Sequence, residues 1–137
     1  MKEGCMQMII FGIDISSLLR AYANFEQFRL HLDSEQERAG AVQAFEYTYE
    51  LSWKVMKRLL ASKGVTANSP RDAFREAALL GFIDNPEEWF GFLETRNRTV
   101  HTYDQDESEL VIATFDTFSA AVNSFLKNIG ALNDTAR

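Results

Sequence analysis

Apolar residues recur along this chain at the three- and four-residue spacing that is typical of amphipathic helices. The spacing is clearest over residues 14–32, 34–62 and 107–128, each of which places large apolar side chains on one face. Two shorter helices are expected to begin after Ser69 and Asn85, because each is a good N-cap residue with proline at the next position. The pattern therefore predicts a chain made of helices joined by short connections.

Polar residues and glycines indicate where these helices begin and end. Ser34 and Glu37 have the spacing of a capping box, which predicts a helix start at residue 34. Gly64, Gly81 and Gly130 follow the apolar repeats and are expected to end three of the helices.

Four carboxylates lie between residues 104 and 109. Asp106 with Glu109 is expected to cap the last helix, since carboxylates favour the free amides of a helix N-terminus. Asp104 and Asp106 also resemble a metal-binding pair, but no third carboxylate is placed beside them and capping is the preferred interpretation.

The elements together predict an all-α protein: an up-and-down antiparallel four-helix bundle with one short extra helix and no sheet. Residues 14–130 are expected to form this single bundle domain. Residues 1–13 are expected to be an N-terminal extension, and residues 131–137 a frayed tail.

Composition narrows the possible functions. The chain has 137 residues, 46% of them hydrophobic, and a formal net charge of −6, which disfavours indiscriminate nucleic-acid binding. A single cysteine, Cys5, excludes an internal disulfide and favours a reducing cytoplasm, while two isolated histidines lack zinc-ligand spacing. We expect no metal and no cofactor. The apolar run over residues 6–13 is far shorter than the roughly 20 residues that cross a bilayer, and it lacks the cleavage site of a signal peptide.

The candidate chemistry lies in the stretch from Arg96 to Tyr103, directly after an apolar helical run. It contains Arg96, Asn97 and His101. Arginine can hold a phosphate with its planar guanidinium, and histidine can move a proton near neutral pH. These groups suit phosphodiester chemistry without a metal, although a polar helix end whose cations offset the helix dipole is the simpler interpretation of the same residues.

Helical geometry limits how these side chains can work together. At 100° per residue, Arg96 and Tyr103 lie within about 20° of each other, whereas Arg96 and His101 diverge by about 140°. Either the helix ends before His101, or the long Arg96 side chain reaches around, or the site joins residues of two chains. Asn97 and His101 share a face and are expected to hydrogen-bond.

The reaction that needs the fewest further groups is RNA transesterification. His101 would take the proton of a ribose 2′-hydroxyl, and Arg96 would stabilise the charge that builds on the phosphate. DNA would not react, because it lacks the attacking hydroxyl.

Several motifs resemble the HEPN domains, and among them the HepT-like group that is also called nucleotidyltransferase substrate-binding proteins. The pattern Arg-x4-His-x-Tyr is the signature of that family. The further matching segments are Phe45–Lys54, Ser69–Arg71, Gly81–Ile83, Trp89 and His101–Asp104. One difference is Val100, where members often carry serine.

The resemblance implies a helical bundle that forms a homodimer and is encoded beside a small nucleotidyltransferase. It further implies a metal-independent endoribonuclease toxin with RNA as its target, in which Arg96 and His101 of both protomers meet in a dimer cleft. The partner would neutralise it by adding AMP to Tyr103. The alternative is a non-catalytic substrate-binding subunit of the nucleotidyltransferase, which the net charge of −6 favours. The sequence leaves open which RNA is cut and what substrate the transferase carries.

Overall fold

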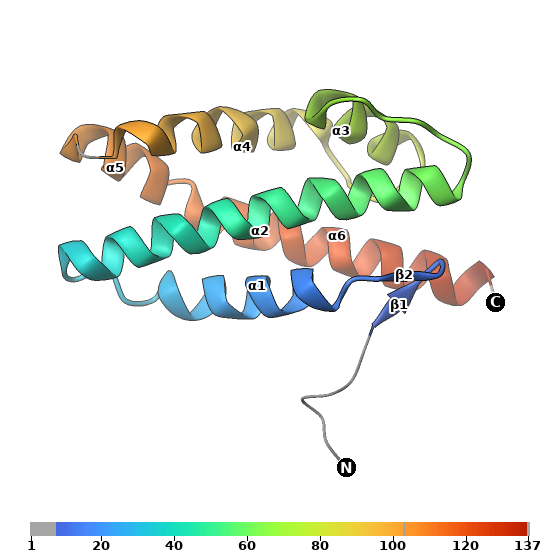
Figure 1. Ribbon diagram of the computed structural model, residues 1–137, viewed down its shortest axis with the longest axis horizontal. Coiled ribbons are helices and arrows are strands. Elements are labelled where there is room, and N and C mark those ends of the chain that lie inside the picture. The colour runs from blue at the N-terminus through green and yellow to red at the C-terminus, as the bar shows by residue number, and fades with distance from the viewer. Residues whose placement is uncertain (1–7, 103, 137) are drawn as a thin grey trace, which may run out of the picture.

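The computed structural model describes residues 8–102 and 104–136, so Cys5 and Tyr103 lie outside the described part. Four long helices run up and down beside one another, and a shorter helix, α3 (Pro70–Leu79), lies at one end of α4 (Figure 1). The four are α1 (Ser16–Phe28), α2 (Glu35–Ser62), α4 (Pro86–Arg98) and α6 (Phe115–Ala136). The predicted four-helix bundle with a short extra helix is confirmed. No helix in the described ranges has the length and apolar character needed to cross a bilayer.

The predicted helix starts and stops are mostly confirmed. Ser34, Ser69 and Asn85 cap α2, α3 and α4, each accepting a hydrogen bond from a backbone N–H two or three residues on. Gly64 and Gly81 follow α2 and α3 with φ near +80°, a backbone conformation that glycine adopts without steric cost. Short-range sequence signals thus place most of the element boundaries.

An aromatic cluster holds the four long helices together. The ring of Phe118 on α6 lies 4.8 Å from Phe45 of α2 and 5.4 Å from Phe25 of α1, measured between centroids. It also lies 5.1 Å from Phe92 and 5.9 Å from Trp89, both on α4. All four contacts are edge-on, the arrangement that aromatic quadrupoles favour. One side chain therefore contacts all three of the other long helices.

Two predicted helices have different limits in the structure. The helix predicted over residues 107–128 is two helices, α5 (Gln105–Ile112) and α6, and Asp104 rather than Asp106 caps the first. Val111 and Phe115 are buried on either side of the break and are four residues apart, so the apolar repeat continues through it. The periodicity could not reveal the break for this reason. Helix α1 ends at Phe28 instead of residue 32, which places His31 in the turn that leads to α2.

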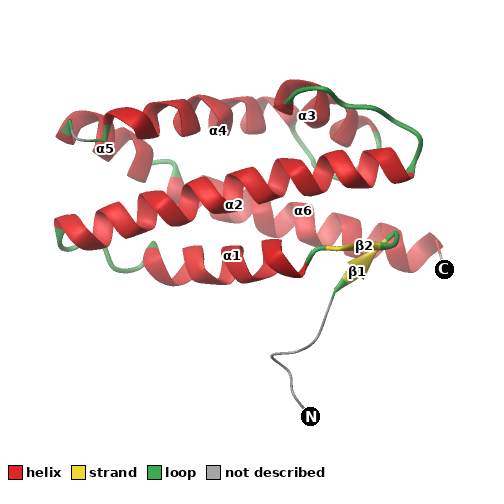
Figure 2. Cartoon of the chain, viewed as in Figure 1, coloured by secondary structure: helices red, strands yellow, loops and turns green. Residues whose placement is uncertain are grey.

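A short hairpin is a further correction, because no sheet was predicted. Strands β1 (Ile9–Ile10) and β2 (Ile13–Asp14) pair antiparallel around Phe11 and Gly12 (Figure 2). Both turn residues have positive φ, as in the type I′ turn of a two-residue hairpin. Ile10 is buried. Each strand has only two residues, so the spacing of apolar residues could not predict the hairpin.

The predicted helix end near Gly130 was wrong. Helix α6 continues to Ala136, and Leu132 packs against the core. The backbone N–H of Phe11 donates to Asn133 Oδ1 at 3.0 Å, which ties the hairpin to the last turns of α6. These contacts offset the roughly 1 kcal/mol that a glycine inside a helix costs relative to alanine.

Replacing Phe118 by alanine should destabilise the whole bundle. The ring is fully buried, and its removal leaves a cavity bordered by rings from three other helices. We expect a loss of about 3–5 kcal/mol in the free energy of unfolding, measured by urea denaturation. Asn123→Ala, at an exposed position of the same helix, should change it by less than about 0.5 kcal/mol. Equal effects of the two substitutions would contradict the central role of this ring.

Candidate functional site

The candidate residues lie where α4 ends and the chain turns toward α5. The α-helix ends at Arg98, and Thr99–His101 form a single 3-10 turn, η2. His101 is therefore outside α4, so the 140° separation calculated for one continuous helix does not apply. Of the three arrangements that the sequence left open, the structure shows a helix that ends before His101.

Arg96 is held against α2 by two carboxylates. Its Nη1 lies 3.9 Å from Glu46 Oε2, and its Nε lies 3.6 Å from Glu50 Oε2. The two glutamates are one helical turn apart and so occupy one face of α2. About 31% of the Arg96 side chain is exposed, so part of the guanidinium borders solvent while the rest is enclosed. A half-enclosed guanidinium of this kind can bind an anion without moving far.

Thr99 connects the 3-10 turn to the same carboxylate. Its hydroxyl donates to Glu46 Oε2 at 2.5 Å, and Thr99 is itself buried. On the other flank, Arg98 Nη1 lies 3.1 Å from Glu107 Oε1 of α5. The two arginines of the motif thus have different contacts: Arg96 with α2 and Arg98 with α5. Together they fix both flanks of the turn that carries His101.

The hydroxyl of Tyr49 lies buried near Arg96. Burial raises the pKa of Tyr49, the charge of Glu50 raises it further, and the cations of Arg96 and Arg71 oppose the shift. The Tyr49 hydroxyl and the Arg96 Nε are the two buried side-chain polar atoms that have no hydrogen-bond partner among the described residues. Burying such groups unsatisfied is costly, and here both can donate toward an acceptor. Among the described residues, the Tyr49 hydroxyl and the Arg96 Nε are therefore the buried side-chain donors that a further acceptor could satisfy.

Asn97 and His101 are both exposed. The backbone carbonyl of His101 accepts from the N–H of Asp104 at 3.0 Å, which closes the turn. The structure thus brings Arg96, Asn97 and His101 to one end of α4, with Arg96 facing α2. The hydrogen bond expected between Asn97 and His101 stays a prediction, and the role expected of Tyr103 falls on a residue outside the described ones.

Glu46, Glu50 and Thr99 were not predicted as site residues. Glu46 and Glu50 belong to the aromatic segment that carries the family resemblance. Their four-residue spacing alone, however, is typical of the solvent-exposed edge of a helix. Their contact with Arg96 depends on how α2 and α4 pack, which no local pattern encodes. The four-residue spacing of two glutamates beside a core face is the signal that could have suggested them.

The site offers a cation, Arg96, and a group that can transfer a proton, His101. Within residues 8–102 and 104–136, no three His, Cys, Asp or Glu side chains are grouped to hold a metal ion. The arrangement offers a partly enclosed guanidinium, an exposed imidazole in the adjoining turn and two carboxylates that orient the guanidinium. Such a set can bind a phosphate and exchange a proton beside it.

Comparison with known proteins gives matches along most of the chain. The model of the family described as nucleotidyltransferase substrate binding protein like matches residues 13–131. A curated protein from Haemophilus influenzae, named probable ribonuclease HepT, is 36% identical over 100 residues, which cover 69% of this chain and 68% of that protein.

Two solved structures share the fold. HI0074 from Haemophilus influenzae, described as having the fold of a substrate binding domain of a nucleotidyltransferase, superposes with a TM-score of 0.75 at 31% identity. The match covers 84% of this chain and 98% of that one. The protein ttk003001694 from Thermus thermophilus superposes with a TM-score of 0.77 at 26% identity, covering 82% and 98% of the two chains. This helical bundle, with its arginine, asparagine and histidine at the end of α4, belongs to the nucleotidyltransferase substrate-binding protein-like family, the HepT-like group.

Proposed function

We propose that this chain is a metal-independent endoribonuclease, the toxin of a two-gene module whose other product is a small nucleotidyltransferase. The observation that carries the proposal is Arg96, oriented by Glu46 and Glu50 and half-exposed beside the turn that presents His101. The 36% identity to a protein named probable ribonuclease HepT supports it.

His101 acts as the general base in this proposal. It accepts the proton of a ribose 2′-hydroxyl, and the 2′-oxygen attacks the adjacent phosphorus. The bond from phosphorus to the 5′-oxygen breaks, a proton from water or from a second imidazole goes to that oxygen, and a 2′,3′-cyclic phosphate remains. Arg96 stabilises the negative charge that the phosphoryl oxygens gain in the transition state.

The carboxylates of α2 have a positioning role. Glu46 and Glu50 hold the guanidinium of Arg96 at the boundary with solvent, and the hydroxyl of Thr99 holds Glu46. An arginine fixed in this way loses less side-chain entropy when a phosphate binds. We propose that a second copy of the chain completes the site, because Arg96 faces α2 and keeps only part of its guanidinium at the solvent boundary, whereas His101 is exposed on the turn beyond α4.

The purified protein should cleave single-stranded RNA in the presence of EDTA and leave cyclic phosphate ends. His101→Ala should lower the cleavage rate by about 10²-fold or more, since it removes the general base. Arg96→Ala should lower it by about 10²–10³-fold through lost charge stabilisation. The measurement is single-turnover cleavage of an end-labelled oligonucleotide.

The matched control is His31→Ala, because His31 is the other histidine and lies exposed in the turn before α2. It should leave the rate unchanged. Cleavage that EDTA abolishes, or that survives loss of His101, would refute the proposed chemistry.

A second candidate function is a non-catalytic binding subunit for the nucleotidyltransferase. The matching family model, the fold description of HI0074 and the net charge of −6 favour it. Both functions involve the same partner, so they differ in whether Arg96 and His101 carry out chemistry and whether Tyr103 receives AMP.

Co-expression with the adjacent transferase separates these two functions. The proposed toxin should gain the mass of AMP on intact mass spectrometry and should lose this gain on Tyr103→Phe. Tyr47→Phe is the matched control, since Tyr47 is a tyrosine with 59% of its surface exposed, and it should keep the added mass. A stable complex of the two proteins without added mass would support the binding subunit instead.

A further inference from the structure

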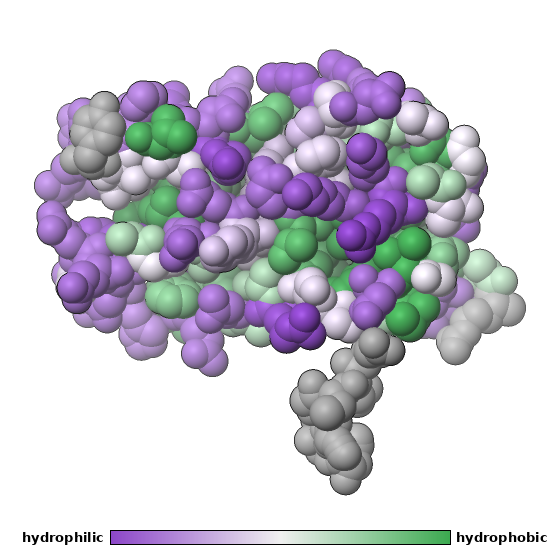
Figure 3. Space-filling view, in the orientation of Figure 1, coloured by the Kyte–Doolittle hydropathy of each residue, from purple (hydrophilic) through white to green (hydrophobic). Residues whose placement is uncertain are grey.

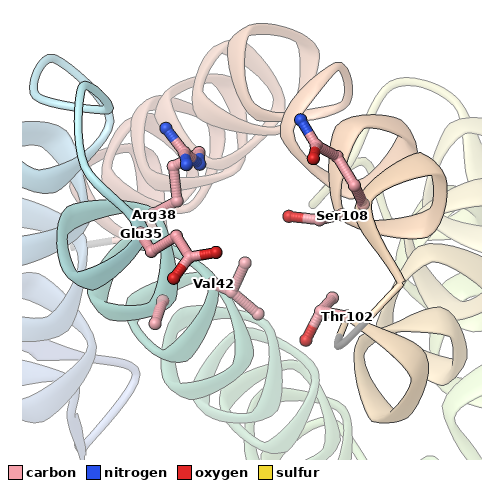
Figure 4. A pocket seen from close by; sticks show the side chains of 7 residues that line it. Glu35, Arg38, Val42, Thr102 and Ser108 are labelled. Carbon is pink, nitrogen blue, oxygen red and sulfur yellow. The ribbon is translucent and has the colours of Figure 1, made fainter.

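A pocket of about 340 Å³ opens beside the motif and has no part in the chemistry described above. Figure 4 shows Glu35 and Arg38 of α2 on one wall, Ser108 of α5 and Thr102 on the facing wall, and Val42 between them. The lining is completed by Ala39 and Gln105. Thr102 directly follows His101 in the chain, so the pocket adjoins the turn that carries the imidazole.

The lining indicates a neutral, flat ligand with polar edges. Glu35 and Arg38 carry opposite charges, so the pocket has no excess charge with which to attract a phosphate. Gln105, Ser108 and Thr102 add hydrogen-bond donors and acceptors, while Val42 and Ala39 give an apolar floor. A nucleobase has this combination of an apolar face and an edge with both donors and acceptors.

The position of the pocket relative to Arg96 supports the same ligand. Val42 and Glu46 are four residues apart on α2 and share a face, with about 6 Å between them along the helix axis. Glu46 is a carboxylate that contacts Arg96. A phosphate at Arg96 and a base over Val42 would therefore be about one helical turn apart, a spacing that one nucleotide can bridge. Figure 3 shows hydrophilic side chains interspersed with apolar ones over the face of the molecule seen in Figure 1.

We propose that this pocket binds a nucleobase of the RNA strand next to the scissile phosphate. The inference rests on the proposed ribonuclease function and deepens it, because it assigns the base contact to Glu35, Arg38 and Gln105, with Val42 as the floor. The base contact makes cleavage selective for the nucleotide at that position.

Binding measurements on the His101→Ala chain test the pocket without cleavage. The probe is a dinucleoside monophosphate, titrated by calorimetry beside ribose 5-phosphate, which lacks a base. The dinucleotide should bind at least tenfold more tightly. Ala39→Tyr, which fills the pocket from an exposed helical position, should remove this difference.

Gln43→Tyr is the matched control, because residue 43 is also exposed on α2 but does not line the pocket. It should leave the tenfold preference intact. Equal affinities for the two probes, or equal effects of the two tyrosine substitutions, would overturn the inference. AMP is titrated as a third probe. If AMP binds, Ala39→Tyr abolishes that binding and the dinucleotide does not bind, the pocket is a mononucleotide site and the proposed RNA-base contact is refuted.

Failure of this inference differs from failure of the proposed function. If the chain with His101 intact cleaves no RNA but the His101→Ala chain prefers the dinucleotide, the ribonuclease is refuted and the base pocket is upheld. If RNA is cleaved in EDTA but Ala39→Tyr leaves dinucleotide binding unchanged, the ribonuclease is upheld and the pocket is refuted.

Discussion

The contact of Phe118 with rings from α1, α2 and α4 is the constraint on which the rest of the structure depends. It sets the distance between α2 and α4, and the candidate site lies beside that interface. Glu46 directly follows Phe45 on α2, and Arg96 lies one turn beyond Phe92 on α4. Once Phe45 and Phe92 pack on Phe118, Glu46 and Arg96 meet at the shared edge of the two helices. The core therefore positions the charges as well as stabilising the fold.

The local charges explain how an acidic chain can be a candidate for RNA chemistry. Arg96 and Arg98 are each paired with glutamates, so the motif is not part of a basic surface. Affinity for RNA would then depend on few phosphate contacts and on base contacts, and salt would weaken it less than it weakens a strongly basic binder. Dependence on base contacts is expected of selective rather than indiscriminate RNA binding.

Much of the fold could be predicted from the sequence because its signals are local. Ser34, Ser69 and Gly64 act within one turn of the backbone, and the apolar repeats record which face is buried. The break before Phe115 was missed because the repeat runs through it, and the extension of α6 past Gly130 depends on its contact with the hairpin.

The candidate site was predictable only in part. Arg96, Asn97 and His101 could be proposed as candidates because they are close together in the sequence. Glu46 and Glu50 could not, because their contacts with Arg96 depend on how two helices pack. Residues about 50 positions apart come into contact only when the helices pack into the bundle. The three- and four-residue spacing of apolar residues does not predict such a contact. The pocket beside Thr102 likewise forms from α2 and α5 and has no continuous sequence signature.

The central claim is that Arg96 and His101 of two copies act together. The direct measurement mixes Arg96→Ala chains with His101→Ala chains, confirms by native mass spectrometry that mixed dimers form, and records RNA cleavage. Each variant alone should be inactive, and the mixture should regain activity because one intact arginine and one intact histidine meet in the mixed dimer. Mixed dimers that form but stay inactive would contradict a site shared between two chains.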